Sequence, residues 1–108
     1  MKKFMLLYMS PVSAEELMKG SPEEMKKSME SWMAWFKKHS VADMGMPLGM
    51  GMKVTKDGSS NVESHTTGYS IVEAEDMEAA KAMVADHPHL MTSDSSIEVL
   101  EVLPMPGM

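Results

Sequence analysis

The residues with the clearest chemical potential are two histidines on either side of a proline, in the run His87-Pro88-His89. An imidazole titrates near neutral pH and is a common metal ligand, so the pair could supply a general base or hold a metal ion. In an enzyme, we expect His87 or His89 to act with Asp94 in a cleft near the end of a sheet. A closed metal site would need a further ligand, since side chains across a proline usually point apart. Candidates for that ligand are His65, Asp94 and Glu98.

The same two histidines also have a structural interpretation, which we favour. Pro88 cannot continue a helix, so His87 would lie at the end of the preceding helical segment. There its side chain could hydrogen bond to the last helix carbonyls, helped by the negative end of the helix dipole. His89 would then pack at the end of the sheet.

A serine beside a histidine, Ser64-His65, resembles a nucleophile with its base. Adjacent side chains in an extended segment face opposite ways, so Ser64 and His65 are poorly placed to pair. We therefore expect His65 to be a solvated loop residue.

The sixteen methionines are several times ordinary usage. Most fit apolar positions of a helix or strand, where methionine fills gaps in a core. The thioethers in the segment 44–52 are dense enough to attract Cu(I), but the run has no cysteine or histidine and is rich in glycine. We expect no cofactor and assign no metal ligands, and copper binding stays an alternative. The four methionines concerned are Met44, Met46, Met50 and Met52.

Five aromatic residues are candidates for an apolar ligand pocket between helices and sheet. An aromatic stripe at helical spacing is first of all core, so packing is the competing interpretation. Trp35 falls at the edge of its stripe, where we expect it to cover the sheet rim or a partner subunit. The five residues are Tyr8, Trp32, Trp35, Phe36 and Tyr69.

Composition limits the class of protein. A chain of 108 residues forms one domain, 1–108, and its net charge of −6 argues against nucleic acid or an anionic membrane as partner. No stretch approaches the roughly 20 apolar residues of a membrane span. The absence of cysteine excludes disulfides and fits a cytoplasmic protein.

Local patterns predict the elements that must position these candidates. Ser21, Pro22 and Glu24 give a strong start signal for a helix that should stop between His39 and Ala42. Glu75 or Asp76 can cap a second helix, which follows an alternating strand. The remaining expectations are a strand at 3–9, a helical turn at 14–18, a strand at 50–55, a hairpin turn at 56–59, a strand from 68, a strand at 96–103 and a loose tail at 104–108.

The order strand, helix, strand, strand, helix, strand predicts an α+β, ferredoxin-like βαββαβ domain. Its four-stranded antiparallel sheet would carry both helices on one face. The first and last strands are apolar on both faces, so something must cover the second face. We expect a homodimer formed through that sheet face.

Several segments together resemble the YCII-related family, in particular its small bacterial proteins of about this length. These segments are KKFMLLY, ESWMAWF, Pro47-Leu48-Gly49, TGYSIVEAEDMEAA, HPHL and SIEVLEVLP. The resemblance implies a ferredoxin-like fold and sheet-to-sheet dimers, the dimeric α+β barrel. Barrel-forming relatives in the wider superfamily, cofactor-independent monooxygenases among them, use apolar pockets for aromatic substrates.

Two family motifs do not carry over. Some members have a histidine on the first helix proposed to work with an aspartate, whereas this chain reads Trp32-Met33-Ala34-Trp35 there. The Asp-Gly-Pro-Phe run of a related subgroup is also missing. We therefore predict a small-molecule-binding or accessory module rather than an enzyme. The alternatives are an enzyme with a histidine and carboxylate cleft, and a metal-binding protein that uses histidines or methionines.

Overall fold

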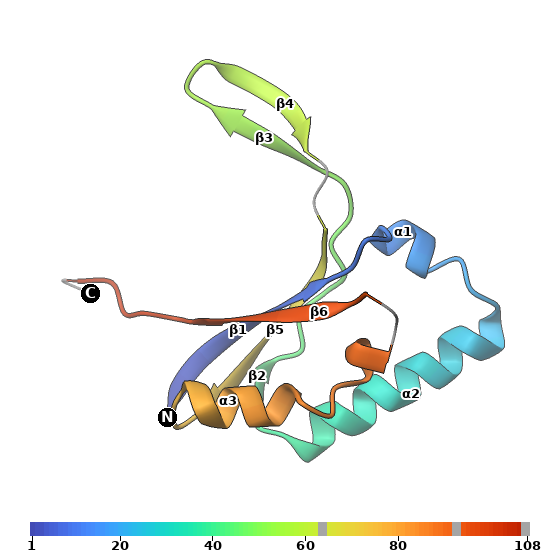
Figure 1. Cartoon of the computed structure of the whole chain (residues 1–108), viewed down its shortest axis with the longest axis vertical. Helices are drawn as coiled ribbons and strands as arrows, with labels where there is room; N and C mark the ends of the chain where they lie inside the picture. The colour runs from blue at the N-terminus through green and yellow to red at the C-terminus, as the bar shows by residue number, and fades with distance from the viewer. Residues whose placement is uncertain (63–64, 92–93, 107–108) are drawn as a thin grey trace.

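A computed structural model describes residues 1–62, 65–91 and 94–106, so the candidate Ser64 lies outside the described residues. The chain forms a four-stranded sheet with helices on one side and a separate two-stranded hairpin (Figure 1). The elements are β1 (Lys2–Met9), α1 (Ala14–Leu17), α2 (Pro22–Lys38), β2 (Val41–Asp43), β3 (Gly51–Thr55), β4 (Gly58–Val62), β5 (Thr66–Ala74), α3 (Met77–Val84), the 3-10 helix η1 (Pro88–Met91) and β6 (Ser96–Glu101).

The strand order in the main sheet is β2-β5-β1-β6, and every pairing is antiparallel. β1 lies in the centre, where Leu7 pairs with Tyr69 of β5 and with Glu98 of β6. The two longer helices, α2 and α3, lie on the same side of this sheet (Figure 1). The predicted α+β, ferredoxin-like fold is confirmed.

The predicted second strand of the sheet was wrong in position. The edge strand is β2, only three residues long, and the segment 50–55 instead pairs with β4 in the separate hairpin. The residues directly after α2 already pair with β5, since the Glu73 amide donates to the Ser40 carbonyl at 2.9 Å. The glycine-rich segment then follows β5 to its far end, and the hairpin forms beyond the sheet. The predicted turn at 56–59 does connect two paired strands.

Both predicted helix starts are confirmed by their caps. The Ser21 hydroxyl accepts from the Glu24 amide at 3.2 Å, and Pro22 occupies the first helical turn. The Asp76 carboxylate accepts from the Ala79 amide at 2.8 Å. Each cap pairs one amide that the first helical turn leaves without a partner.

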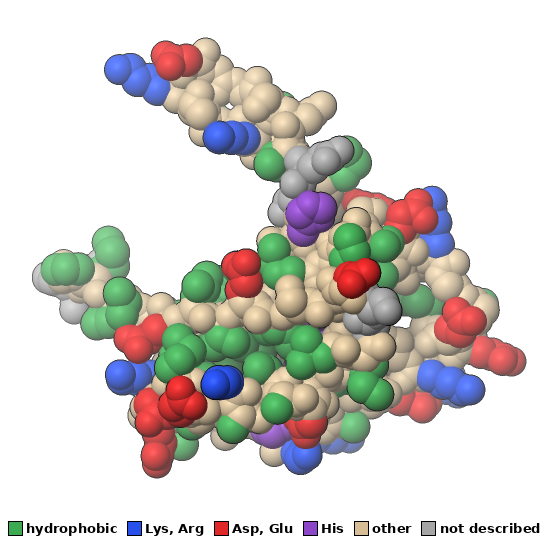
Figure 2. Space-filling view, viewed as in Figure 1, with side chains coloured by type: hydrophobic (Ala, Val, Ile, Leu, Met, Phe, Trp, Pro, Cys, Tyr) green, Lys and Arg blue, Asp and Glu red, His purple; other side chains and the backbone are tan. Residues whose placement is uncertain are grey.

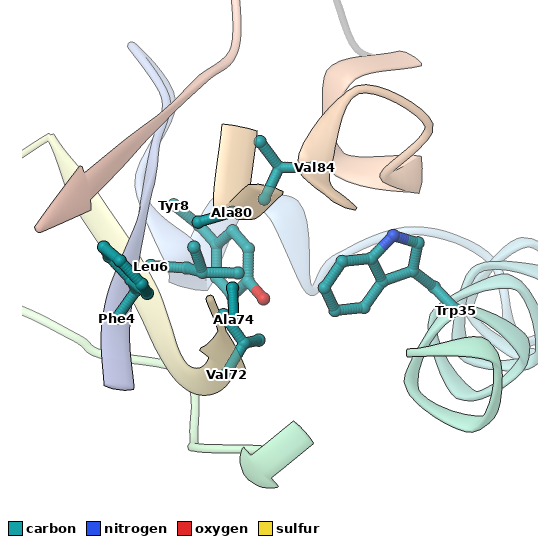
Figure 3. Packing of buried hydrophobic residues seen from close by; sticks show 8 residues of the cluster. All are labelled: Phe4, Leu6, Tyr8, Trp35, Val72, Ala74, Ala80 and Val84. Carbon is teal, nitrogen blue, oxygen red and sulfur yellow. The ribbon is translucent and has the colours of Figure 1, made fainter. Parts of the chain in front are cut away.

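The core lies between the sheet and the helices, and Trp35 is part of it. The expectation that Trp35 covers the sheet rim or a partner was wrong, because the side chain is only 4% exposed. Its indole donates to the Met83 carbonyl at 3.2 Å, so the end of α3 fixes its orientation, whereas Met29 of the same helix is 62% exposed. Figure 3 shows Trp35 extending from α2 toward the strand residues. The buried apolar cluster is Phe4, Leu6, Tyr8, Trp35, Val72, Ala74, Ala80 and Val84.

The other sheet face, here called the outer face, has no helix over it. Met5, Ile71 and Leu100 are paired neighbours there, and Leu7 and Tyr69 continue the patch. Leu100 is half exposed, and the other four are partly buried.

The hairpin and the C-terminal tail extend beyond the body of the chain. Every residue of β3 and β4 is exposed, and so are residues 102–106. Figure 2 shows both segments standing clear, with charged side chains near the hairpin tip and hydrophobic ones on the tail. The radius of gyration, 15.4 Å, exceeds the ~13 Å expected for a compact domain of this length.

Candidate functional site

His87 lies inside a group of rings that we call the aromatic–histidine cluster, made of Tyr8, Trp32, Trp35, His87 and His89. The His87 side chain is 1% exposed. Its ring centroid lies 4.4 Å from that of Trp35, 4.6 Å from that of Trp32 and 4.9 Å from that of Tyr8. The turn after α3 positions His87 in this cluster, since the His87 amide donates to the Val84 carbonyl at 3.1 Å.

A chain of hydrogen bonds through His87 has a fixed direction. Its last acceptor is the Met44 carbonyl, which can only accept, so the Ser70 hydroxyl donates to it at 2.7 Å. The Tyr8 hydroxyl then donates to Ser70 at 2.7 Å and must accept from His87 Nε2, 3.2 Å away. His87 Nδ1 accepts from the His89 amide at 3.0 Å. The neutral tautomer with hydrogen on Nε2 satisfies all of these contacts.

Burial favours the neutral forms of the two titratable groups in this hydrogen-bond chain, His87 and Tyr8. It lowers the pKa of His87 to about 4, and the neighbouring His89 acts in the same direction. Burial also raises the pKa of Tyr8 to about 12, against the opposing effect of its hydrogen bond with Ser70. Near neutral pH, neither group is poised to exchange a proton.

The second histidine is held by the backbone. His89 is 7% exposed, and its Nε2 donates to the Met9 carbonyl at 2.9 Å, at the end of β1. The His87 side chain does not bind helix carbonyls, contrary to the structural interpretation from sequence, because its Nδ1 is an acceptor. Both imidazoles therefore join η1 to the sheet.

The carboxylates proposed to assist the histidines are not buried with them. Asp94 is exposed in the turn before β6, with a left-handed backbone (φ 62°). Glu98 is exposed on the outer face, and His65 is exposed before β5. Within the described part of the chain, no three His, Asp or Glu side chains are grouped as metal ligands. The four exposed methionines of the segment 44–52 are spread from the loop after β2 into β3.

Four of the five aromatic pocket candidates come together. The ring centroids of Tyr8 and Trp32 are 4.7 Å apart, and those of Trp32 and Phe36 are 6.1 Å apart. The two histidines pack among these rings, so the space that the sequence suggested for a ligand is filled by side chains. Tyr69 is on the outer face, beside Leu7.

A polar cluster that the sequence did not indicate joins the ends of α2 and α3. Lys38 Nζ lies 2.6 Å from Asp86, and the Trp35 indole donates to the same carboxylate at 3.1 Å. The hydrogen bond from Lys38 lowers the pKa of Asp86 to about 2. His39 Nε2 is 3.4 Å from this carboxylate, and its ring lies on that of Trp35. The cluster closes one end of the core.

An open groove of about 390 Å³ lies just past the end of β1. One wall comes from the residues that lead from β1 into α1, and the other from the segment 48–50 together with Val62 and His65. Backbone bonds hold these walls, because the Ser10 amide donates to His65 at 2.8 Å and the Leu48 amide to Thr67 at 3.0 Å. The lining residues are Ser10, Pro11, Ser13, Ala14, Glu15, Leu48, Gly49, Met50, Val62, His65 and Thr66.

Glu15 of α1 reaches across the mouth of this groove. Its Oε1 accepts from the Met50 amide at 3.3 Å. A Cβ at position 49 would lie 2.6 Å from that oxygen, so glycine lets the carboxylate come close. No sequence pattern pointed to Glu15, because its partner Met50 lies 35 residues away along the chain.

Comparison with known proteins gives one family. The model of the YCII-related domain matches residues 1–106 of the chain. No curated protein matches the chain. No helix in the described ranges is long and apolar enough to cross a membrane.

Proposed function

The chain belongs to the YCII-related domain family, and from that premise we propose that it is a homodimer that binds a small molecule. The observation that carries the binding function is the groove beside Glu15. It combines an open volume, an apolar lining and several polar side chains. We assign the ligand to this groove rather than to the aromatic–histidine cluster, where side chains occupy the space.

The groove has the size and composition of a small-molecule site. About 390 Å³ falls in the usual range for ligand pockets, roughly 300–1,000 Å³. Leu48, Met50 and Val62 supply apolar surface, while Ser13 and Glu15 supply oxygen atoms that can orient a ligand. The walls are backbone-bonded to the main sheet, so the site is largely formed before a ligand arrives.

The outer face supports the homodimer. It places Met5, Leu7, Ile71 and Leu100 on three adjacent strands with no helix above them. A group of apolar side chains of this kind, edged by Glu98, is uncommon on a monomer, and a second copy offers a patch of the same chemistry. The exposed hairpin adds support, because an isolated two-stranded hairpin is marginally stable in water and gains from packing on a partner.

Ligand binding is tested by screening small fragments against isotope-labelled protein. We expect the fragments to shift backbone amide resonances of the groove, such as those of Ser10 and Leu48. Leu48→Trp should fill the groove and remove these shifts. Leu90→Trp is the matched control, because Leu48 and Leu90 are 38% and 39% exposed and only Leu48 lines the groove. Equal fragment binding by both variants would contradict the assignment.

The homodimer is tested by sedimentation in dilute solution. We expect a mass of twice 11.9 kDa. Leu100→Glu should give single chains, because it adds a second charge on the same strand as Glu98 and sets it against the apolar Met5. Leu90→Glu, outside this face, should remain dimeric. Wild-type protein that sediments with the single-chain mass of 11.9 kDa would contradict the homodimer.

A further inference from the structure

We infer that the ligand of the groove is a small apolar amine, whose ammonium group pairs with Glu15. This inference rests on the proposed binding function and adds the chemical class of the ligand. It follows from the charge state of the groove mouth and from the surface behind it.

The Glu15 carboxylate lies at the groove without a cation. Among the described residues, no lysine, histidine or N-terminal nitrogen lies within 4 Å of it, whereas the adjacent Glu16 pairs with Lys19 at 2.9 Å. In the described part of the chain, the one hydrogen bond of the Glu15 side chain is the long one from the Met50 amide to Oε1, which leaves the second oxygen for a ligand. A carboxylate held in position in this way favours a donor with positive charge.

The surface behind Glu15 suits an apolar body. Pro11, Leu48 and Val62 line the groove together with the long side chain of Met50. An alkyl or aromatic group placed there would leave water for apolar contacts, which is favourable in proportion to the area covered. A flexible methionine can adapt to the shape of the group that binds.

The overall charge of the protein acts in the same direction. A net charge of −6 attracts cations and repels anions over distances comparable to the Debye length. An anionic ligand would in addition bring a second negative charge next to Glu15, which costs free energy that an ammonium group avoids. Charge complementarity therefore selects the amine over an acid of the same shape.

Three probes of similar shape test the class: 2-phenylethylamine, 2-phenylethanol and phenylacetate. Their affinities are measured by amide resonance shifts near neutral pH and low ionic strength. We expect the amine to bind about threefold to tenfold more tightly than the alcohol, and phenylacetate to bind most weakly. Added salt should reduce the preference for the amine.

Two matched variants identify the carboxylate responsible. Glu15→Gln keeps the shape of the side chain and should bring the affinity for the amine down to that for the alcohol. Glu16→Gln, on the next residue of α1 and outside the groove, should leave the preference intact.

The outcomes separate this inference from the proposed function. If the alcohol and the amine bind the groove equally, or if Glu15→Gln retains the preference for the amine, the ligand class is wrong while the groove remains a binding site. If none of the probes shifts groove resonances at millimolar concentration while fragments of the screen do, only the ligand class is wrong. If neither the probes nor the fragments shift them, the binding function is overturned as well.

Discussion

The aromatic–histidine cluster and the groove begin two residues apart on the chain, at Tyr8 and Ser10, yet they differ in every property that matters for binding. In the cluster, rings fill the space and both nitrogens of His87 have hydrogen-bond partners. In the groove, about 390 Å³ is open and Glu15 has no cation among the described residues. The residues with the most chemical promise in the sequence thus serve the fold. The open site is built from side chains that looked ordinary.

The largest test of this difference is to remove a buried ring from the aromatic–histidine cluster. Trp35→Ala should lower the free energy of unfolding by about 3–5 kcal/mol, because it removes a buried indole and leaves a cavity. The measurement is denaturant unfolding followed by circular dichroism. Met29→Ala on the same helix is the control and should cost less than about 0.5 kcal/mol, since Met29 is exposed. A Trp35 effect below 1 kcal/mol would show that the cluster is not a rigid core.

Changing the pH tests the buried cluster without any substitution, because His87 makes stability depend on pH. The folded state lowers the pKa of His87 from 6.5 to about 4, so between these values the unfolded state binds more protons and stability rises with pH. The contribution of the buried neutral His87 to the free energy of unfolding is complete above pH 6.5 and amounts to about 3 kcal/mol. It is lost as the pH falls toward 4. Unfolding free energies measured between pH 4 and 7 should show this rise.

Two variants isolate the histidine responsible. His87→Gln should flatten the rise, whereas His65→Gln should keep it, because His65 is exposed. The lowered pKa of Asp86 acts in a separate range, since its contribution is complete above pH 3.8 and is lost as pH falls toward 2. A His87→Gln variant with an unchanged slope between pH 4 and 6.5 would refute the buried neutral histidine.

Removing one hydroxyl tests the hydrogen-bond chain alone. Tyr8→Phe keeps the ring but leaves His87 Nε2 without an acceptor and Ser70 without its donor. We expect a loss of about 1–3 kcal/mol in unfolding free energy, the usual cost of a buried polar group without a partner. Tyr69→Phe, on the outer face, should change stability by less than about 0.5 kcal/mol. Similar losses of unfolding free energy in both variants would argue against a special role for the buried chain of hydrogen bonds.

The smallest effect on stability is expected in the groove. Glu15→Gln should change the unfolding free energy by less than about 0.5 kcal/mol, since the one hydrogen bond of Glu15 with the described residues is long and exposed. The measurement is the same denaturant unfolding used for the cluster variants. A loss above 1 kcal/mol would mean that Glu15 holds the segment 48–50 in place as part of the fold.

The sequence predicted well the parts of the fold that depend on local signals. The capping residues Ser21 and Asp76 begin their helices as expected, and the alternating segment from Gly68 lies within the interior strand β5. Each of these signals lies within the element that it specifies, so hydrophobic period and cap chemistry were sufficient to identify it.

The features that escaped prediction depend on contacts between distant parts of the chain. β2 is too short to show a period and exists because β5 offers it a pairing edge. His87 contacts Tyr8 across a separation of 79 residues, and no spacing rule could indicate that contact. The groove also joins separate segments, so the contact between Glu15 and Met50, 35 residues apart, became visible only in the structure.

The two edges of the four-stranded sheet bear on the behaviour of the protein at high concentration. One edge is the three-residue β2, and the other is β6, which carries Glu98 and Glu101 and leads into Pro104 and Pro106. Short strands, charges and residues without an N–H group all hinder the addition of another strand. Growth into fibrils along the hydrogen-bonding direction is therefore opposed at both ends. This protection of both edges agrees with the proposed homodimer, which uses a sheet face instead of a sheet edge.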